Sequence, residues 1–472
     1  MHRSYPPTRP LQRRPARALG LRTHRQPRHR RRLVRGRHPH NQPPRLSRHR
    51  QGTAGLPEHL PLRHARPIAR LDQATHASQD SQEARHQMSS HHDVIVVGVG
   101  SMGAAACLHL AKRGTKVLGI DNQSIPNSNS SYNGNTRVIR LTYQEHPDYV
   151  PLLKEAYRLW DEIEQETNTR LLHKTGVLYM GFPDGEAISG VKLASEKHGL
   201  PYSTLTHAEL AQQFPQFTLP EAMVGALEPE GGYLLSERAV ESYARAAQQH
   251  GATLLTNEPV LGWSHDTHGV TVQTTSGTHT AGKLILCAGA WSGSLLRLPN
   301  LELTVTRQIL GWVRPAKATP FQRGKFPVWN IDPTGDGDLT GIYYGFPMSD
   351  DPGEGSGLKL ACHHPGQPMP PDAITAETFP ADEEEIRLPL RRYLPGALGP
   401  VEAIKVCKYT NSADGHFVID RHPESDRVHF ACGFSGHGFK FSSVMGQILS
   451  DLALEGQTNH PIDFLRLRRF NN

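Results

Sequence analysis

The sequence contains little cysteine, no long apolar run and, across its first 87 residues, no lysine. The five cysteines form no C-x-x-C pair, which excludes a disulfide framework, gives no reason to expect a metal site and fits a reducing compartment. No apolar run reaches the roughly 18 residues of a membrane-spanning helix, and the N-terminus lacks the apolar core of a secretory signal. We therefore expect a cytoplasmic protein without a membrane partner.

Positive charge is concentrated at the N-terminus. Residues 1–87 contain 20 arginines and four acids, a net charge of +16, so the chain total of +7 leaves −9 for residues 88–472. Proline, arginine and histidine are mixed there without apolar periodicity, and such a segment cannot bury enough apolar surface to offset its chain entropy. The sequence therefore predicts a disordered basic tail in front of an acidic body.

Three interpretations of the tail are open. It is a nucleic-acid-binding arm, an arginine-rich organelle targeting segment, or the translation of an over-extended reading frame. We favour the third, because arginine without lysine is typical of GC-rich DNA translated outside its coding frame, and Met88 lies just before the first predicted strand. The acidic body gives no support for a nucleic-acid partner.

Residues 93–121 carry a dinucleotide-binding pattern. An apolar, β-branched run is followed by Gly98, Gly100 and Gly103 in the G-x-G-x-x-G spacing. An alanine-rich helix over 101–113 and a second strand ending in Asp121 come next, and a carboxylate at that point binds ribose hydroxyls. Asp121 disfavours NADP, but the pattern by itself leaves NAD and FAD open.

Further along the chain, strand and helix patterns alternate. Residues 236–251 predict a helix with Ser236 as its N-cap, and 270–283 predict a hairpin, followed by a separate apolar strand at 284–291. We expect an α/β fold in which a Rossmann-type nucleotide domain (91–175, 233–300 and 401–470) is interleaved with an α+β, mixed-sheet substrate domain. That second domain comprises residues 176–232 and 301–400.

Several polar side chains stand in apolar or glycine-rich surroundings. Lys440 lies in a glycine-rich loop (431–443) that precedes an apolar helix, where backbone N–H groups face a ligand. Arg137 and Arg140 are three residues apart and would point the same way on a helix. Lys359 alternates with leucines on a predicted strand, for which a solvent-facing side chain is the commoner outcome.

The ordered set of motifs resembles the monomeric sarcosine oxidase and N-methyltryptophan oxidase family of FAD-dependent amine oxidases. The resemblance covers about residues 92–470 and rests on the fingerprint with Asp121 and on TRVIR (136–140), GVLYMG (176–181), IYYGFP (342–347), GLKL (357–360), VCKYT (406–410) and GFSGHGFKFSS (433–443). It implies a Rossmann-type FAD domain with a mixed sheet over the flavin ring. It also implies a monomer that oxidises secondary amines, commonly N-methyl amino acids, and passes electrons to oxygen to give hydrogen peroxide.

The resemblance also implies residue roles. Cys407 is the covalent attachment point of the flavin, and Lys405 and Lys408 would favour its thiolate. Arg140 and Lys440 hold the substrate carboxylate, and Lys359 beside the flavin activates oxygen. Arg137 lines the other flavin face, and the substrate cavity is lined by Tyr344, His363 and Tyr409. The remaining FAD contacts are assigned to Gly98, Gly100, Ser101, Met102, Gly103, Asp121, Thr136, Gly436 and Gly438.

One departure from the family pattern concerns Asn133, which stands where the family has a histidine before its Gly-Asp-Thr-Arg segment. Asparagine does not change charge near neutral pH, so substrate preference or the pH profile is expected to differ. The predicted reaction converts sarcosine, oxygen and water to glycine, formaldehyde and hydrogen peroxide. The alternative is an oxidase of another secondary amine: N-methyltryptophan, pipecolate or a glycated amino acid.

Overall fold

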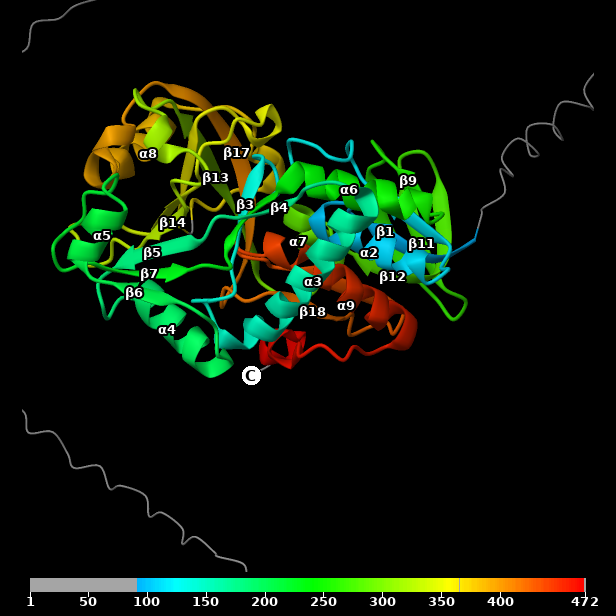
Figure 1. Cartoon of the computed structure of the whole chain (residues 1–472). Helices are drawn as coiled ribbons and strands as arrows, with labels where there is room; N and C mark the ends of the chain where they lie inside the picture. The colour runs from blue at the N-terminus through cyan, green and yellow to red at the C-terminus, as the bar shows by residue number, and fades with distance from the viewer. Residues whose placement is uncertain (1–90, 365, 471–472) are drawn as a thin grey trace, which may run out of the picture. The chain divides into compact units, whose positions relative to one another are not determined.

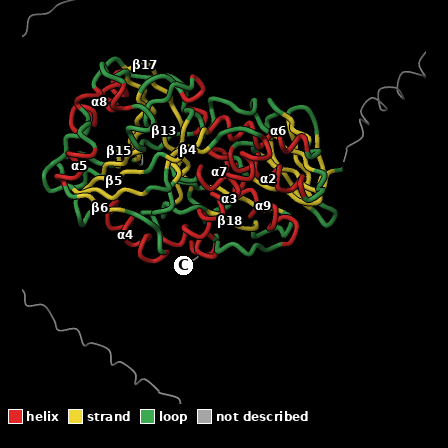
Figure 2. Tube along the Cα trace, viewed as in Figure 1, coloured by secondary structure: helices red, strands yellow, loops and turns green. Residues whose placement is uncertain are grey.

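The computed structural model describes residues 91–364 and 366–470, which lie within one compact unit of the chain, Thr75–Asn472. Two eight-stranded sheets and one three-stranded sheet form its β-structure, and Figure 1 shows them with their helices. Figure 2 shows the helices, strands and loops along the same chain trace. The tail at 1–87, with its three interpretations, lies outside the described residues.

The first sheet contains the predicted dinucleotide-binding pattern. Its strand order is β10-β11-β12-β1-β2-β9, with β19 pairing beside β12 and β18 beside β19. β1 pairs in parallel with β2 and with β12, as crossover connections require. The strands are β1 (His92–Val97), β2 (Val117–Ile120), β9 (Thr253–Leu255), β10 (Val260–His265), β11 (Val270–Thr274), β12 (Thr278–Leu286), β18 (Val418–Arg421) and β19 (Val428–Cys432).

The long strand β12 differs from the prediction. The hairpin of β11 with β12 is present, but the return strand and the apolar strand expected at 284–291 are one continuous strand that ends at Leu286. Its first half pairs with β11 and its second half with β19, while its other edge pairs with β1 along most of its length. The change from alternating to fully apolar residues within β12 therefore marks the point where its partner strand changes from β11 to β19. It does not mark the end of a strand.

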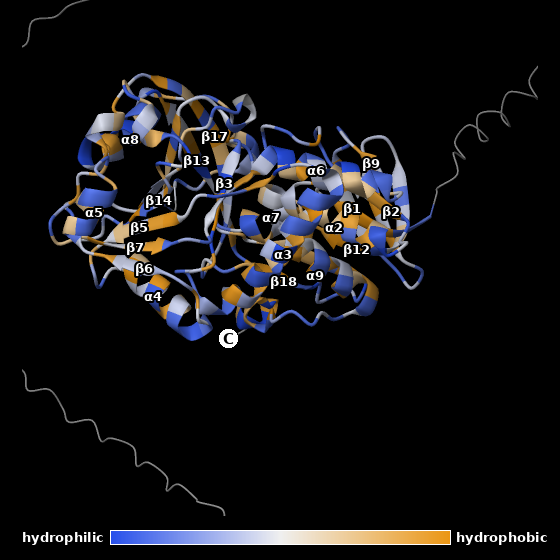
Figure 3. Ribbon diagram, viewed as in Figure 1, coloured by the Kyte–Doolittle hydropathy of each residue, from blue (hydrophilic) through white to orange (hydrophobic). Residues whose placement is uncertain are grey.

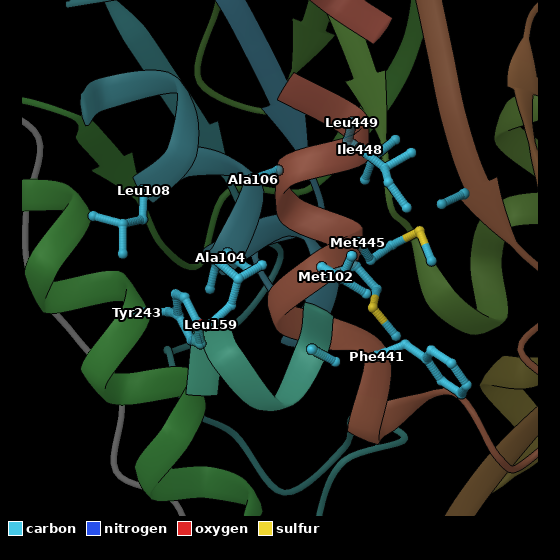
Figure 4. Packing of buried hydrophobic residues seen from close by; sticks show 14 of the residues in the cluster. Met102, Ala104, Ala106, Leu108, Leu159, Tyr243, Phe441, Met445, Ile448 and Leu449 are labelled. Carbon is cyan, nitrogen blue, oxygen red and sulfur yellow. The ribbon is translucent and has the colours of Figure 1, made fainter. Parts of the chain in front are cut away.

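Four helices cover the first sheet and form the main core: α2 (Ser101–Lys112), α3 (Val150–Thr167), α6 (Ser236–Gln249) and α9 (Ser442–Glu455). Figure 4 shows Met102 of α2 lying close to Met445 of α9. A Cβ on Gly446 would lie 2.6 Å from the Cβ of Ala105, so α2 and α9 approach closely only because position 446 is glycine. This packing fixes the N-terminus of α9 beside the N-terminus of α2.

The second sheet is the predicted mixed sheet, with strand order β17-β13-β16-β15-β14-β5-β7-β6. Only the β14–β5 pair is parallel among its ladders in the described residues. Figure 3 shows hydrophobic residues concentrated on strands such as β5, β7 and β17. The strands are β5 (Val177–Gly181), β6 (Ser203–Leu205), β7 (Val224–Glu228), β13 (Leu303–Val313), β14 (Val328–Ile331), β15 (Ile342–Gly345), β16 (Leu358–His363) and β17 (Val401–Ser412).

The predicted α/β fold with a second mixed sheet is confirmed. β17 pairs along its length with β13 of the second sheet, although the sequence analysis grouped residues 401–412 with the nucleotide-binding segments. The domain boundaries themselves stay a prediction. The remaining helices are α4 (Glu186–His198), α5 (His207–Gln213), α7 (Ser292–Leu296) and α8 (Pro380–Tyr393).

The three-stranded sheet corrects two local predictions. It consists of β3 (Thr136–Ile139), β8 (Gly232–Leu235) and β4 (Leu172–Lys174). Arg137 therefore lies on a strand and not on a helix, so helical spacing does not relate it to Arg140. Leu235, and not Ser236, is the N-cap of α6, because the ladder of β8 continues to the residue before the helix.

Within the described ranges, no helix is both long and apolar enough to cross a membrane. The same residues contain no group of three or more histidine, cysteine, aspartate or glutamate side chains placed to hold a metal ion.

Candidate active site

The glycine-rich turn between β1 and α2 opens onto the larger of two adjoining cavities. Gly98 has a φ of +86°, and a Cβ there would lie 2.4 Å from the carbonyl oxygen of Cys287. A Cβ on Gly103 would lie 1.9 Å from the carbonyl oxygen of Gly98, so only glycine lets α2 begin so close to the strand. At the end of β2, Asp121 Oδ2 accepts a hydrogen bond from the Val99 N–H at 2.8 Å. This is the cradle that a pyrophosphate and a ribose need.

The larger cavity has a volume of about 600 Å³, within the roughly 300–1,000 Å³ range of cofactor and ligand pockets. Of the predicted FAD contacts, Gly103, Thr136 and Cys407 do not line it. Those that do are Gly98, Gly100, Ser101, Met102, Asp121, Gly436 and Gly438. Gly436 has a φ of +78°, and a Cβ there would lie 2.3 Å from the Tyr409 ring, so the loop before α9 passes close to β17.

The smaller cavity has a volume of about 70 Å³ and shares Arg137, Tyr409, Gly436 and Phe439 with the larger one. The two cavities therefore adjoin. Besides these shared residues, the lining consists of Val138, Arg140, Gln144, Glu145, Asn330, Ile342, Tyr344, His363, His437 and Lys440. Every residue predicted to touch the substrate lines the smaller cavity.

One face of the second sheet forms a wall of the smaller cavity. Asn330 lies opposite Tyr344 in the β14–β15 ladder, and Ile342 lies opposite His363 in the β15–β16 ladder. Residues opposite each other, and residues two apart on one strand, share a face, so these four side chains point to the same side. His363 Nδ1 is 3.3 Å from the hydroxyl of Tyr409 on β17, and burial lowers the pKa of His363 to about 4.

Arg140 and Lys440 both lie close to the Tyr143 ring. The Arg140 guanidinium is 4.5 Å and the Lys440 ammonium 5.1 Å from its centroid. Both cations are buried, and Lys440 Nζ donates to the carbonyl oxygen of His437 at 2.7 Å. Burial, reinforced by the charge of Arg140, lowers the pKa of Lys440 to about 7. Two cations thus meet at one small cavity, as a carboxylate site requires.

Arg140 already has an internal partner that the sequence analysis did not predict. Its Nη2 donates to Glu145 Oε1 at 2.6 Å. Burial opposes ionisation of Glu145, but Arg140, His437 and Lys440 outweigh it and hold the pKa of this carboxyl at about 2. An incoming carboxylate therefore competes with Glu145 for Arg140.

His437 is neutral and held at both ring nitrogens. Burial lowers its pKa to about 3. Nε2 lies 2.9 Å from the carbonyl oxygen of Gly415, which only accepts hydrogen bonds, so Nε2 carries the hydrogen. Nδ1 must then accept from the hydroxyl of Tyr143. This tautomer holds the Tyr143 ring close to both cations.

Lys359 does not face solvent, contrary to the commoner outcome for its strand position. Its ammonium donates to the carbonyl oxygens of Gly134 at 2.6 Å and Thr136 at 2.7 Å, and to the Thr136 hydroxyl at 3.0 Å. Burial, followed by the charge of Arg137, lowers the pKa of Lys359 well below its ordinary value. The segment 134–136 turns the side chain inward because it supplies three acceptors.

The segment that carries Gly134 and Arg137 is held by two further contacts. Glu237 at the start of α6 accepts from the N–H groups of Gly134 at 2.7 Å and Asn135 at 2.8 Å. Asn133 is buried and donates to the carbonyl oxygens of Ser128 and Val406, at 2.8 and 3.2 Å. Asn133 therefore ties this segment to β17 directly beside position 407.

Cys407 is buried in a cluster with Leu310, Trp312, Ala361 and Tyr409. Burial raises its pKa, and the charges of Arg137, Lys359 and Lys408 only oppose this shift. Lys408 therefore favours the thiolate, as predicted, but its effect is smaller than that of burial, and Lys405 has no part in the shift. Lys405 Nζ donates instead to Asn135 Oδ1 at 3.1 Å.

The sequence analysis assigned no role to seven residues that line the smaller cavity: Val138, Gln144, Glu145, Asn330, Ile342, His437 and Phe439. Glu145 and Gln144 follow Tyr143 in a segment without periodicity, where an acid and an amide resemble solvated loop residues. Asn330 is a single polar residue between Trp329 and Ile331 on an apolar strand. This isolated polar position was the one sequence feature that could have identified it as a cavity residue.

A nucleotide cradle, a cofactor-sized cavity and a small cationic cavity beneath a mixed sheet define a flavin-dependent oxidoreductase. The model of the FAD dependent oxidoreductase family matches residues 93–452. The chain belongs to this family and, within it, to the monomeric sarcosine oxidase and N-methyltryptophan oxidase group of FAD-dependent amine oxidases, as the resemblance implied.

Two relatives illustrate the match. The chain is 40% identical over 387 residues to a monomeric sarcosine oxidase of Bacillus sp. (strain NS-129), covering 81% of this chain and 98% of that one. It is 33% identical over 381 residues to an N-methyl-L-tryptophan oxidase of Yersinia pestis (strain Pestoides F), covering 80% of this chain and 99% of that one.

Solved structures show the same fold. The open form of NikD, an unusual amino acid oxidase essential for nikkomycin biosynthesis, matches with a TM-score of 0.71 at 27% identity, over 80% of this chain and 97% of that one. L-proline dehydrogenase from P. horikoshii matches with a TM-score of 0.68 at 21% identity, over 81% of this chain and 99% of that one.

Proposed function

We propose that the protein oxidises a small N-methyl amino acid, with oxygen as electron acceptor. The observation that carries the proposal is the pair of buried cations, Arg140 and Lys440, at a cavity of about 70 Å³ that adjoins the cofactor-sized cavity. Sarcosine, water and oxygen would give glycine, formaldehyde and hydrogen peroxide. The relatives named monomeric sarcosine oxidase support both this substrate and a monomeric state.

The residues present fit FAD. The Gly98–Met102 turn would hold the pyrophosphate at the N-terminus of α2, and Asp121 would bind the adenosine ribose. The loop with Gly436 and Gly438 closes the far end of the same cavity. When bound, FAD supplies the redox chemistry: it accepts a hydride from the carbon next to nitrogen and delivers two electrons to oxygen.

The protein's own contribution is to orient the substrate and exclude water. Arg140 and Lys440 would grip the carboxylate from two directions, which fixes the N-methyl group toward the larger cavity. Tyr344, His363 and Tyr409 close the sheet side of the smaller cavity. Its volume favours sarcosine over N-methyltryptophan, pipecolate or a glycated amino acid.

Lys359 and Arg137 are the two cations that the resemblance places at the flavin. Lys359 is held at segment 134–136, and Arg137 lines both cavities. A fixed cation stabilises negative charge that develops on oxygen as it accepts electrons. We propose that Lys359 supplies this charge and that Arg137 lines the opposite flavin face.

We also propose that Cys407 tethers the flavin covalently. Cys407 would supply Sγ for a bond to the 8α-carbon of FAD, with one hydrogen lost from the thiol and one from the methyl group. Oxygen would take up the two hydrogens and two electrons as hydrogen peroxide. Cys407 shares a sheet face with Tyr409 and lies in one cluster with it, beside the cavity wall.

Peroxide release from a panel of amines tests the reaction. Purified protein is expected to produce peroxide with sarcosine at a kcat/KM at least about tenfold above that with N-methyltryptophan, pipecolate or fructosyl-glycine. Arg140→Met should raise the KM for sarcosine by about 10²-fold, because a buried charge-assisted contact is lost. Preferential oxidation of one of the larger amines would overturn the assignment of sarcosine.

Carboxylate binding is expected to weaken at high pH. Lys440 must be charged to bind an anion and its pKa is about 7, so affinity is full below pH 7 and falls as Lys440 loses its proton above it. The Kd of methoxyacetate, which has no amine to titrate, should rise up to about tenfold per pH unit above 7 and level off where Arg140 alone remains. The Kd is measured from the change in flavin absorbance.

The same titration on Lys440→Met identifies the titrating group. His363, His437 and Glu145 have pKa values of about 4, 3 and 2, so none of them changes charge near pH 7. The variant should bind weakly with a Kd independent of pH from 6 to 9. An unchanged inflection near pH 7 in the variant would assign the titration to another group, Lys359 being the first to test.

Glu145→Gln is expected to tighten methoxyacetate binding about tenfold, which corresponds to ~1.4 kcal/mol. The substitution removes the anion that occupies Arg140. The measurement belongs at pH 6, where Lys440 remains charged. Asp148→Asn, which breaks a surface ion pair with Lys197 in the same region, is the matched control and should leave the Kd unchanged. Weaker binding by the Gln variant would show that Glu145 supports the anion site.

A further inference from the structure

Asn330 is a buried amide without a partner at the smaller cavity. It lies on β14, is 7% exposed and lines the cavity beside Tyr344. Its side chain makes no hydrogen bond to any residue that the structure describes. An amide carries two donors and one acceptor, and leaving them unpaired in a buried position is costly.

Two more polar atoms at the same cavity are unpaired. Gln144 Oε1 and Glu145 Oε2 are buried and have no hydrogen-bond partner in the described part of the chain. Three residues that line this cavity, from two separate segments, thus carry side-chain polar groups without a partner in the described part of the chain. Because buried polar groups are normally paired, this concentration indicates a ligand that has hydrogen-bonding groups beyond its carboxylate.

Asn330 lies on a different wall of the cavity from the two cations. Arg140 and Lys440 already have partners in Glu145 Oε1 and the His437 carbonyl, and they are the cations that would grip an anion. Asn330 belongs to the sheet wall with Ile342 and Tyr344. A carboxylate held by the cations leaves the substituent on its neighbouring carbon as the part of the substrate that reaches this wall.

We propose that Asn330 is a specificity-determining residue that selects an N-methyl amino acid whose α-carbon carries a short hydroxylated group, such as hydroxymethyl. The Asn330 Nδ2–H donates to the hydroxyl oxygen, and the hydroxyl hydrogen is donated to Gln144 Oε1 or Glu145 Oε2. Sarcosine lacks this group and leaves all three unpaired. The inference rests on the proposed function and refines its substrate class.

The test compares two substrates of equal shape, N-methylserine and N-methyl-2-aminobutyrate, in which a methyl group replaces the hydroxyl. Both enantiomers of each are assayed with the holoenzyme for peroxide release. The wild type should prefer N-methylserine by about tenfold or more in kcat/KM. Asn330→Leu keeps the volume but removes the hydrogen bonds, so the preference should vanish or reverse, and Asn330→Ser should retain part of it. A wild-type ratio near one, or an unchanged ratio in Asn330→Leu, overturns the proposal.

A binding experiment decides the question even without turnover. Calorimetry on the wild-type holoenzyme compares 3-hydroxypropanoate with butanoate, which differ by the same hydroxyl-for-methyl exchange and carry no amine. We expect the hydroxylated acid to bind about tenfold more tightly, and equal or tighter binding of butanoate overturns the inference. If no amine yields peroxide, the proposed oxidase function fails, whereas this binding ratio still reports on Asn330.

Discussion

Cys407→Ser is expected to turn a permanently flavinylated protein into one that releases its flavin on denaturation. A serine hydroxyl remains protonated and is a weak nucleophile in a buried site, so no bond to the 8α-carbon forms. The mass of the denatured wild type should exceed that of the polypeptide by one FAD less two hydrogens, and the mass of the variant should not. The same spectrum reports whether translation begins at Met1 or Met88.

The rate at which FAD becomes covalently attached to Cys407 should also depend on pH. Burial raises the pKa of Cys407 in the cofactor-free protein, and the thiolate is the attacking form. The rate at which FAD becomes acid-stable on apoprotein should therefore rise with pH, by about tenfold per unit below the thiol pKa. A rate that falls over this interval would point to a cationic group, and not the thiolate, as limiting.

Cys362→Ser is the matched control. Cys362 is also buried in the second sheet, but it follows Ala361 on β16 and so points to the opposite face from Tyr344. Burial likewise raises its pKa, to about 12. This variant should keep its covalent flavin. Flavin that survives denaturation in Cys407→Ser, or is lost from the wild type, would contradict the assignment of the tether.

The nucleotide-binding half was predictable because its signals are local. Gly103 is required by its close approach to Gly98 within one strand–turn–helix unit, Gly98 has a positive φ in the turn itself, and Asp121 follows the next strand. β12 was divided in two because its composition changes midway, where its partner on one edge changes from β11 to β19. Strand pairing over such sequence distances has no local signal.

The candidate active site likewise combines features that the sequence predicted with features that depend on distant contacts. Tyr344, His363 and Tyr409 come together because three ladders of the second sheet are in register, which the family resemblance could imply but spacing could not. Lys359 points inward because segment 134–136, more than 220 residues away, offers three acceptors. Glu145 gains its role from the ion pair with Arg140, which depends on the fold of one loop.

Lys359→Met is expected to slow reoxidation of the reduced enzyme by oxygen about 10²–10³-fold while leaving reduction by substrate nearly unchanged. Removing one preorganised charge at a developing anion typically costs this much. Methionine preserves most of the length of this buried side chain, so the surrounding packing is retained. Anaerobic reduction with sarcosine, followed by rapid mixing with oxygenated buffer, separates the two half-reactions.

Lys405→Met is the comparison that tests whether the position of the lysine matters, and not its positive charge alone. The Lys405 and Lys359 ammonium groups each lie 5.5 Å from the centroid of the Trp312 ring, but Lys405 donates to the Asn135 side chain, whereas Lys359 donates to Gly134 and Thr136. If only the local field mattered, the two variants would slow oxygen reduction alike. If the cation is required at the position of Lys359, Lys405→Met stays within about twofold of wild type. Equal losses in both variants, or a loss in the substrate half-reaction of Lys359→Met, would remove Lys359 from its proposed role.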